Sequence, residues 1–232
     1  MMDILKLFSN VTSKDKNEAI EILIAHSTPR RDFFLMVVLS IAMAVFGIYL
    51  HSVVILIGSM LIAPVLYPVL TVALGMTISD VSLIKRSLYT LGKSILFALV
   101  ISIVISIFLG TESVTIEGIT NNSDIVIYGA VAIVSGIAAS FAMAKPQLNE
   151  AFPGVAVSVS LVPPLASIGV GIAALDMSII RPATLIFMVN VLGIVFSSMI
   201  VFSLLNLYTK KEIATEELEK QDKQLEQEKR EG

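Results

Sequence analysis

Long apolar stretches separated by short polar segments dominate the chain. The stretches cover residues 33–50, 52–78, 87–109, 124–144, 152–174 and 183–208. Each is close to the length of about 20 residues that a helix needs to cross the hydrocarbon core of a bilayer. Charged side chains gather between these stretches and at the two ends of the chain. The pattern predicts an all-helical, multi-pass membrane protein with six transmembrane helices.

The second and fifth stretches carry prolines near their middle. Pro64 and Pro68 lie in the second stretch, and Pro163 and Pro164 lie in the fifth. Proline removes a backbone donor and clashes with the preceding turn, so both helices are expected to be interrupted. On this interpretation, replacing Pro68 or Pro164 with alanine would tend to restore a continuous helix. Interrupted backbone at membrane depth is tolerated where it is buried in protein or lines a cavity.

The two interrupted stretches match each other at a spacing of 96 residues. This shift places Gly58, Pro68, Gly75 and Asp80 on Gly154, Pro164, Gly171 and Asp176. We interpret the match as a duplication with three helices in each copy. An odd number of crossings per copy would insert the second copy upside down, which predicts two inverted repeats.

Polar segments divide the chain into five parts. We predict an amphipathic segment over residues 1–32, a first repeat over 33–110, an extracytoplasmic loop over 111–123, a second repeat over 124–208 and a charged helical tail over 209–232. Most lysines and arginines of the short loops fall on the side of the two termini. Such residues favour the cytoplasmic side, so both termini are predicted to be cytoplasmic in the cell membrane.

Two segments outside the repeats have their own patterns. Residues 14–27 place Ala19, Ile20, Leu23 and Ile24 on one helical face, which would lie on the membrane surface or pack against the protein. The tail holds six basic and eight acidic residues over 210–231 and should form a charged helix. Its heptad pattern is weak, so a solvated tail and an oligomerising tail both remain open.

Small residues line one face of the third and fourth helices. The two faces consist of Ser94, Ala98, Ser102, Ser106 and Gly110, and of Gly129, Ala132, Gly136 and Ser140. Small residues let membrane helices approach closely, so these faces are expected to contact protein rather than to line a pore. We also predict from them that the protein forms a homo-oligomer.

Composition narrows the possible chemistry. Hydrophobic residues make up 56% of the chain and charged residues 15%, with a mean hydropathy of +0.88. The chain contains no cysteine, no histidine pair with zinc spacing and no phosphate-binding glycine loop. We therefore expect no enzymatic activity, no cofactor, no bound metal and no nucleic-acid partner.

The candidate site lies between the two proline interruptions, where freed backbone groups and a few hydroxyls would be the main polar surface. Its predicted lining residues are Ser59, Pro64, Tyr67, Pro68, Ser160, Pro163, Pro164 and Asn190. Such a site suits a neutral solute, or an ion held by backbone carbonyls. The predicted function is a transporter or channel for a small solute or ion; the alternative is a non-transporting scaffold or sensor that recruits partners through its tail.

Two motifs carry a resemblance to a known family. Residues 58–68 read GSMLIAPVLYP, and residues 153–169 read PGVAVSVSLVPPLASIG. With the segment 187–190, they resemble the uncharacterised membrane family called domain of unknown function 389, over about residues 29–208. The family occurs in bacteria and archaea. The resemblance implies a membrane fold but supplies no substrate and no catalytic residue.

Overall fold

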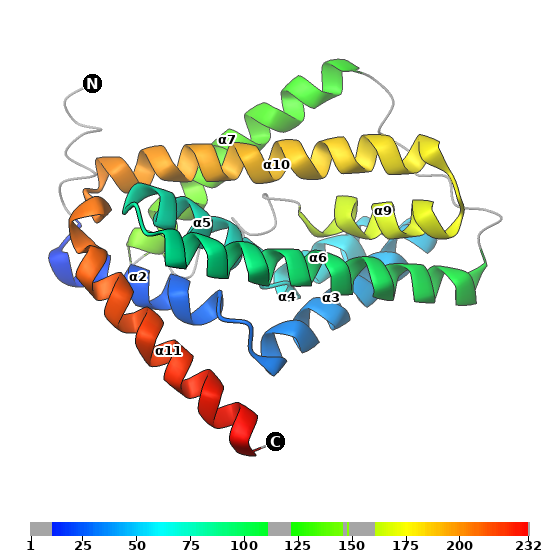
Figure 1. Cartoon of the computed structure of the whole chain (residues 1–232). Coiled ribbons are helices and arrows are strands. Elements are labelled where there is room, and N and C mark those ends of the chain that lie inside the picture. The colour runs from blue at the N-terminus through cyan, green and yellow to red at the C-terminus, as the bar shows by residue number, and fades with distance from the viewer. Residues whose placement is uncertain (1–10, 111–121, 146–147, 149–160, 232) are drawn as a thin grey trace.

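The computed structural model describes residues 11–110, 122–145, 148 and 161–231 (Figure 1). The main elements there are α2 (Ser13–His26), α3 (Arg31–Tyr49), α4 (Val53–Ile62), α5 (Leu66–Thr77), α6 (Val81–Leu109), α7 (Asn122–Ala144), α9 (Val162–Ala173), α10 (Met177–Leu204), the short 3-10 helix η2 (Leu207–Lys210) and α11 (Lys211–Glu231). All of these elements are helices, as the apolar pattern predicted.

The long helices are apolar enough to cross a membrane. Within the described residues, α3, α6, α7 and α10 each meet that condition by length and composition. The α4 and α5 helices form a pair bent by 51°, which would be a fifth span. The predicted fifth stretch is represented by the short helix α9, because residues 149–160 lie outside the described part. Four or five candidate spans are thus seen, which is compatible with a multi-pass membrane protein.

Helices α6 and α10 run in opposite directions through the centre of the molecule (Figure 1). The Lys211 ammonium, just after α10, donates to the carbonyl of Ser79, just before α6. This contact places the end of one long helix beside the start of the other. The short helices α5 and α9 each pack against both long helices, so the four elements form the centre of the fold.

Three helix hairpins share one turn geometry. In each, the N-cap residue of the next helix donates its backbone N–H to a glycine carbonyl five positions earlier, at 2.9 Å: Ser52 to Gly47, Asp80 to Gly75 and Asp176 to Gly171. The residue before each donor has a positive φ, of 48° at His51, 53° at Ser79 and 54° at Leu175. These are the bonds and the left-handed residue of a Schellman motif.

Each of these glycines also admits a side chain of the following helix. A Cβ on Gly47, Gly75 or Gly171 would lie 3.0, 2.8 or 2.9 Å from the side chain nine positions later. The glycine therefore closes the turn and allows tight packing of the hairpin. The α5–α6 and α9–α10 hairpins match at the spacing of 96 residues in helix bounds, turn angles and capping aspartate.

Replacing Leu175 with glycine should raise the free energy of unfolding by about 1 kcal/mol, because a left-handed conformation is strained for a residue with a Cβ. Leu175 is 88% exposed, so the change removes little packing. Ala174→Gly is the matched control, because its φ of −81° is helical and glycine there should not stabilise. Thermal unfolding in detergent measures both. Equal melting temperatures for the two variants would contradict the strain at Leu175.

The small-residue faces are used inside the chain. Ser94, Ala98, Ser102 and Ser106 are fully buried, and the Ser102 hydroxyl donates to the Ala166 carbonyl of α9 at 2.7 Å. On α7, Ala132 and Gly136 lie against α10, where a Cβ on Gly193 would come 2.7 Å from that of Ala132. The helix-packing interpretation is confirmed. Homo-oligomer formation stays a prediction, without the support that these faces were expected to give it.

The two flanking helices dock on the helical body. Helix α2 buries the predicted face of Ala19, Ile20, Leu23 and Ile24, and it contacts α5 and α11. A capping box between Thr12 and Asp15 begins α2. Of the two predicted alternatives, packing against the protein is therefore observed. The charged tail forms the helix α11, and α2 covers one side of it.

Candidate functional site

Pro64 creates the break between α4 and α5. Ala63 is extended, with φ −72° and ψ 121°, as expected of a residue that precedes proline. Proline at 64 also removes the N–H that would continue the ladder of α4. The last carbonyls of α4 therefore need other partners. The carbonyl of Ser59 accepts the hydroxyl of Ser40 at 2.8 Å.

The other three prolines lie in the first turns of helices. Pro68 is the third residue of α5, and Pro163 and Pro164 are the second and third residues of α9. The first N–H groups of a helix have no partner within it, so proline is tolerated at these positions. These prolines start helices rather than interrupt them. The expectation that Pro68→Ala would restore a continuous helix therefore applies to Pro64 instead.

A pocket of about 320 Å³ opens beside the break. We call it the Pro64 pocket. Its lining residues are Ala25, His26, Thr28, Arg30, Asp32, Phe33, Met36, Ile62 and Pro64. The walls thus come from the end of α2, the α2–α3 link, the start of α3 and the α4–α5 break. Apolar side chains form much of the lining, and one cation and one carboxylate lie among them. This size and composition fall within the usual range of small-molecule sites.

Tyr67 and His26 connect the break to helix α2. Their rings stack with centroids 4.7 Å apart. The Nδ1 atom of His26 lies 2.9 Å from the carbonyl of Ile22, which can only accept, so Nδ1 carries the proton. One turn further along α5, the Thr71 hydroxyl donates to the Leu23 carbonyl at 3.1 Å. Helix α2 is therefore fixed against the amino-terminal half of α5.

The remaining predicted site residues are distributed over three helices. Ser59 is buried in α4, with its hydroxyl donating to the Leu56 carbonyl. Asn190 is buried in the middle of α10, and Pro164 is buried in α9. Ser160 lies outside the described residues. Of the seven predicted residues that the structure describes, Pro64 alone lines the Pro64 pocket, and Tyr67 stacks on a lining residue.

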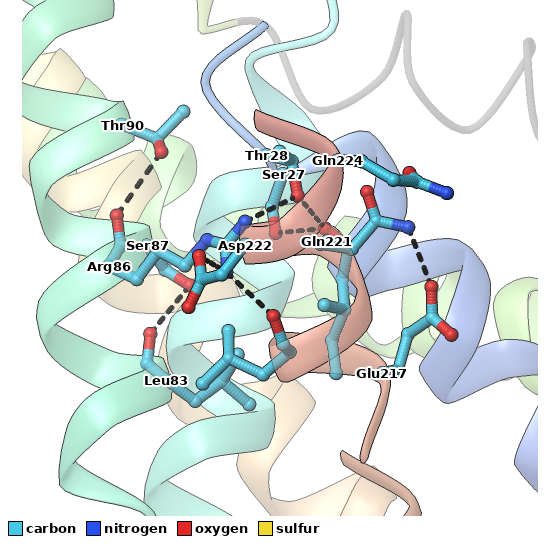
Figure 2. A network of polar contacts seen from close by, with 12 residues as sticks. Ser27, Thr28, Leu83, Arg86, Ser87, Thr90, Glu217, Gln221, Asp222 and Gln224 are labelled. Carbon is cyan, nitrogen blue, oxygen red and sulfur yellow. Dashed lines mark hydrogen bonds and ion pairs between the residues drawn. The ribbon is translucent and has the colours of Figure 1, made fainter. Parts of the chain in front are cut away.

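A polar network involves two residues that line the Pro64 pocket, and Figure 2 shows the part of it around Arg86. Arg86 of α6 donates from Nη2 to the Thr28 hydroxyl at 3.2 Å and from Nη1 to the Asp222 carboxylate of α11 at 2.5 Å. Arg30 donates from Nη2 to the side-chain oxygens of Gln221, at 2.6 Å, and Gln224. Helix α6 thus contacts Thr28 and α11 contacts Arg30, and both of these residues line the pocket.

Sequence reasoning missed His26, Arg30 and the residues around them as part of a site. The available signal was the amphipathic face of α2, which required a partner surface. Nothing in the sequence indicates that this partner is α5, beside the break.

Asp80 and Asp176 serve as helix caps at opposite ends of the central pair. Asp80 accepts the N–H groups of Ser82 and Leu83, at 2.9 and 3.1 Å. Asp176 accepts the backbone N–H of Ser178 at 2.8 Å. Hydrogen bonds from the side chain and the backbone of Ser178 lower the pKa of the Asp176 carboxyl below its ordinary value. Within the described residues, no group of three His, Asp or Glu side chains is placed to hold a metal ion.

Comparisons with known proteins agree with the two sequence motifs. An uncharacterised protein of Methanocaldococcus jannaschii is 30% identical over 176 residues, which cover 75% of this chain and 54% of the relative. The chain thus spans about half the length of the curated relative that it matches. No solved structure matches the chain. The profile of the domain of unknown function DUF389 matches residues 60–196, from the end of α4 through most of α10, and the chain belongs to that family.

Proposed function

We propose that the protein moves a small solute or ion across a membrane through the region of the α4–α5 break. The observation that carries the proposal is the break at Pro64, which opens onto the Pro64 pocket in an otherwise apolar set of helices. Discontinuous helices of this kind form the binding sites of many secondary transporters. A scaffold that only anchors itself in a membrane has no need of an interrupted span.

The proposal includes an inverted repeat. Its support is the recurrence of α5 and α6 as α9 and α10, with the same turn geometry and capping aspartates, and the opposite directions of the two long helices. In this arrangement α5 and α9 begin in the interior and run toward opposite ends of the molecule. Within each hairpin the two helices rise equally per residue from the turn. Asn190 on α10 is therefore expected at the level of the start of α9, and Ser94 on α6 at the level of the start of α5.

The chemistry of the region favours a small solute with few charges. Within α4 and α5, the polar groups are backbone carbonyls, helix amino termini and the hydroxyls of Ser59, Tyr67, Thr71 and Thr77. Helix amino termini carry a partial positive charge, and carbonyls offer ligands to cations. The formal charges in the lining of the Pro64 pocket are those of Arg30 and Asp32. The solute class is therefore a neutral molecule or a single ion.

Flux through purified protein tests the proposal. The protein in liposomes, screened with small neutral solutes and with monovalent and divalent ions, should release at least one of them faster than protein-free liposomes. Liposomes carrying heat-denatured protein control for leakage caused by the protein surface. Release no faster than that of protein-free liposomes for every solute would favour the scaffold or sensor alternative.

The orientation gives a second test. Both termini are expected on the cytoplasmic side and residues 111–123 outside, because the basic residues of short loops lie on the side of the termini. The chain has no cysteine, so single cysteines can be placed at residues 117 and 220. An impermeant thiol reagent applied to intact cells should label the first position much faster. Equal labelling of the two would contradict this orientation.

A further inference from the structure

The tail helix α11 is held mainly by polar contacts. Its buried residues Ala214, Glu217, Leu218 and Gln221 follow one helical stripe, and half-buried Ile213 also packs against the core. Only Leu218 and Ile213 are large apolar side chains. The hydrophobic contribution to docking grows with the apolar area removed from water, so this stripe contributes modestly. Charged and polar contacts must supply much of the remainder.

Two arginines outside α11 receive these contacts, Arg30 and Arg86, and Figure 2 shows those of Arg86. Arg86 pairs with the Asp222 carboxylate at 2.5 Å and also donates to the Leu218 carbonyl at 3.2 Å. Arg30 donates to two glutamine side chains of α11, and its Nε lies 3.8 Å from the Glu228 carboxylate. Helix α11 therefore offsets the positive charges of Arg30 and Arg86, which come from different parts of the chain.

Both arginines act on the Pro64 pocket. Arg30 lines the pocket directly, and Arg86 holds the hydroxyl of Thr28, another lining residue. Helix α11 also covers α2, whose last turn provides Ala25 and His26 to the pocket wall. Undocking of α11 would thus release Arg30 and, through Arg86, the hydroxyl of Thr28, while α2 stays packed on α5.

The contacts are accessible to salt. The side chain of Asp222 is 61% exposed and that of Glu228 is 46% exposed, whereas that of Arg86 is 12% exposed. Exposed ion pairs are weak and are screened as the Debye length falls from about 10 Å at 0.1 M to about 3 Å at 1 M ionic strength. The carboxylates of α11 are therefore exposed to solvent, whereas Arg86 is largely buried in the rest of the protein.

We propose that α11 is an electrostatic latch on the lining of the Pro64 pocket: while Asp222 pairs with Arg86 it keeps Arg30 and Thr28 fixed and access to the pocket narrow, and raised ionic strength releases it. The regulation rests on the proposed transport function, because it controls access to the same pocket. A transporter with this latch would respond to the ionic strength on the side where the tail lies.

Access to the pocket can be measured without a known solute. Ala25→Cys places a single thiol in the pocket wall of a chain that has no other. In lipid nanodiscs at low salt, adding Asp222→Asn should raise the labelling rate by a water-soluble thiol reagent about two- to fivefold, the range expected for loss of a partly exposed pair. High salt should raise the rate of the parent by a similar factor. A cysteine at the exposed position Lys14 corrects for salt effects on the reagent.

Two further variants make the result specific. Glu226→Gln removes one carboxylate from the exposed side of α11, so it should leave the labelling rate unchanged. The conservative change Asp222→Glu keeps the carboxylate and should keep labelling slow. Equal rates for Asp222→Asn and Glu226→Gln would overturn the latch, and so would an Asp222→Glu variant that labels as fast as Asp222→Asn.

The latch and the transport function fail in different ways. Faster labelling of Asp222→Asn in a protein that carries no tested solute would support the latch and count against transport. Measurable flux that Asp222→Asn leaves unchanged, despite faster labelling, would support transport and overturn the regulatory role. Flux that rises with the labelling rate supports both.

Discussion

Replacing Gly136 with leucine is expected to lower the free energy of unfolding by about 3 kcal/mol, the upper part of the range for overpacked interiors. An added Cβ would lie 2.1 Å from the Ser197 hydroxyl and 2.8 Å from the Cα of Ile194. A side chain can rotate away, but the Ile194 contact is backbone, so α7 and α10 must separate. Thermal unfolding in mild detergent measures the loss.

Gly92→Leu is the matched control. It makes the same substitution within helix α6, where a Cβ at Gly92 meets nothing within 4 Å. Leucine favours the helix over glycine, so this variant should be as stable as the parent or slightly more stable. If Gly136→Leu melts with the parent but shifts an oligomer to monomers, the α7–α10 contact lies between copies and the fold described above is wrong at this point.

Replacing Pro64 with alanine is expected to reduce flux at least about tenfold while the protein still inserts and folds. Alanine restores the missing N–H and lifts the restriction on Ala63, so α4 can continue into α5. The carbonyls exposed at the break then become engaged within the helix. Loss of one hydrogen bond to a solute costs about 1.5 kcal/mol, which is about tenfold in binding. Initial flux rates in liposomes measure the effect.

Pro68→Ala controls for the general effect of losing a proline. Pro68 lies in the first turn of α5, where its missing N–H has no partner to lose. Flux through this variant should stay within about twofold of the parent. If Pro64→Ala also keeps parental flux, the break shapes packing alone and the pathway lies elsewhere.

Much of the fold was predictable because it is local. The apolar stretches gave α3, α6, α7 and α10, and the periodic face of residues 19–24 gave the buried side of α2. The small-residue faces correctly indicated close helix contacts. What they could not indicate was the partner, because a small face fits a helix of the same chain as well as one of another copy.

The candidate site was only partly predictable. Pro64 was identified because the restriction that proline places on the preceding residue is a local property of the chain. Pro68, Pro163 and Pro164 were assigned to the interruption, although their effect depends on where each helix begins. The start of each helix differs by a few residues from what the composition suggests. A proline expected inside a helix, where it would break it, therefore lies in the first turn, where it is tolerated.

The sequence by itself determined that this is a helical membrane protein with an interrupted helix and a matching second copy of its motif. Those properties follow from hydropathy, proline geometry and spacing along the chain. Only the tertiary structure decided that α2 packs on α5 beside Pro64, where His26 stacks on Tyr67, and that α11 docks on α6, where Asp222 pairs with Arg86. These residues lie far apart in the chain, and their meeting depends on how whole helices pack, which no local pattern encodes.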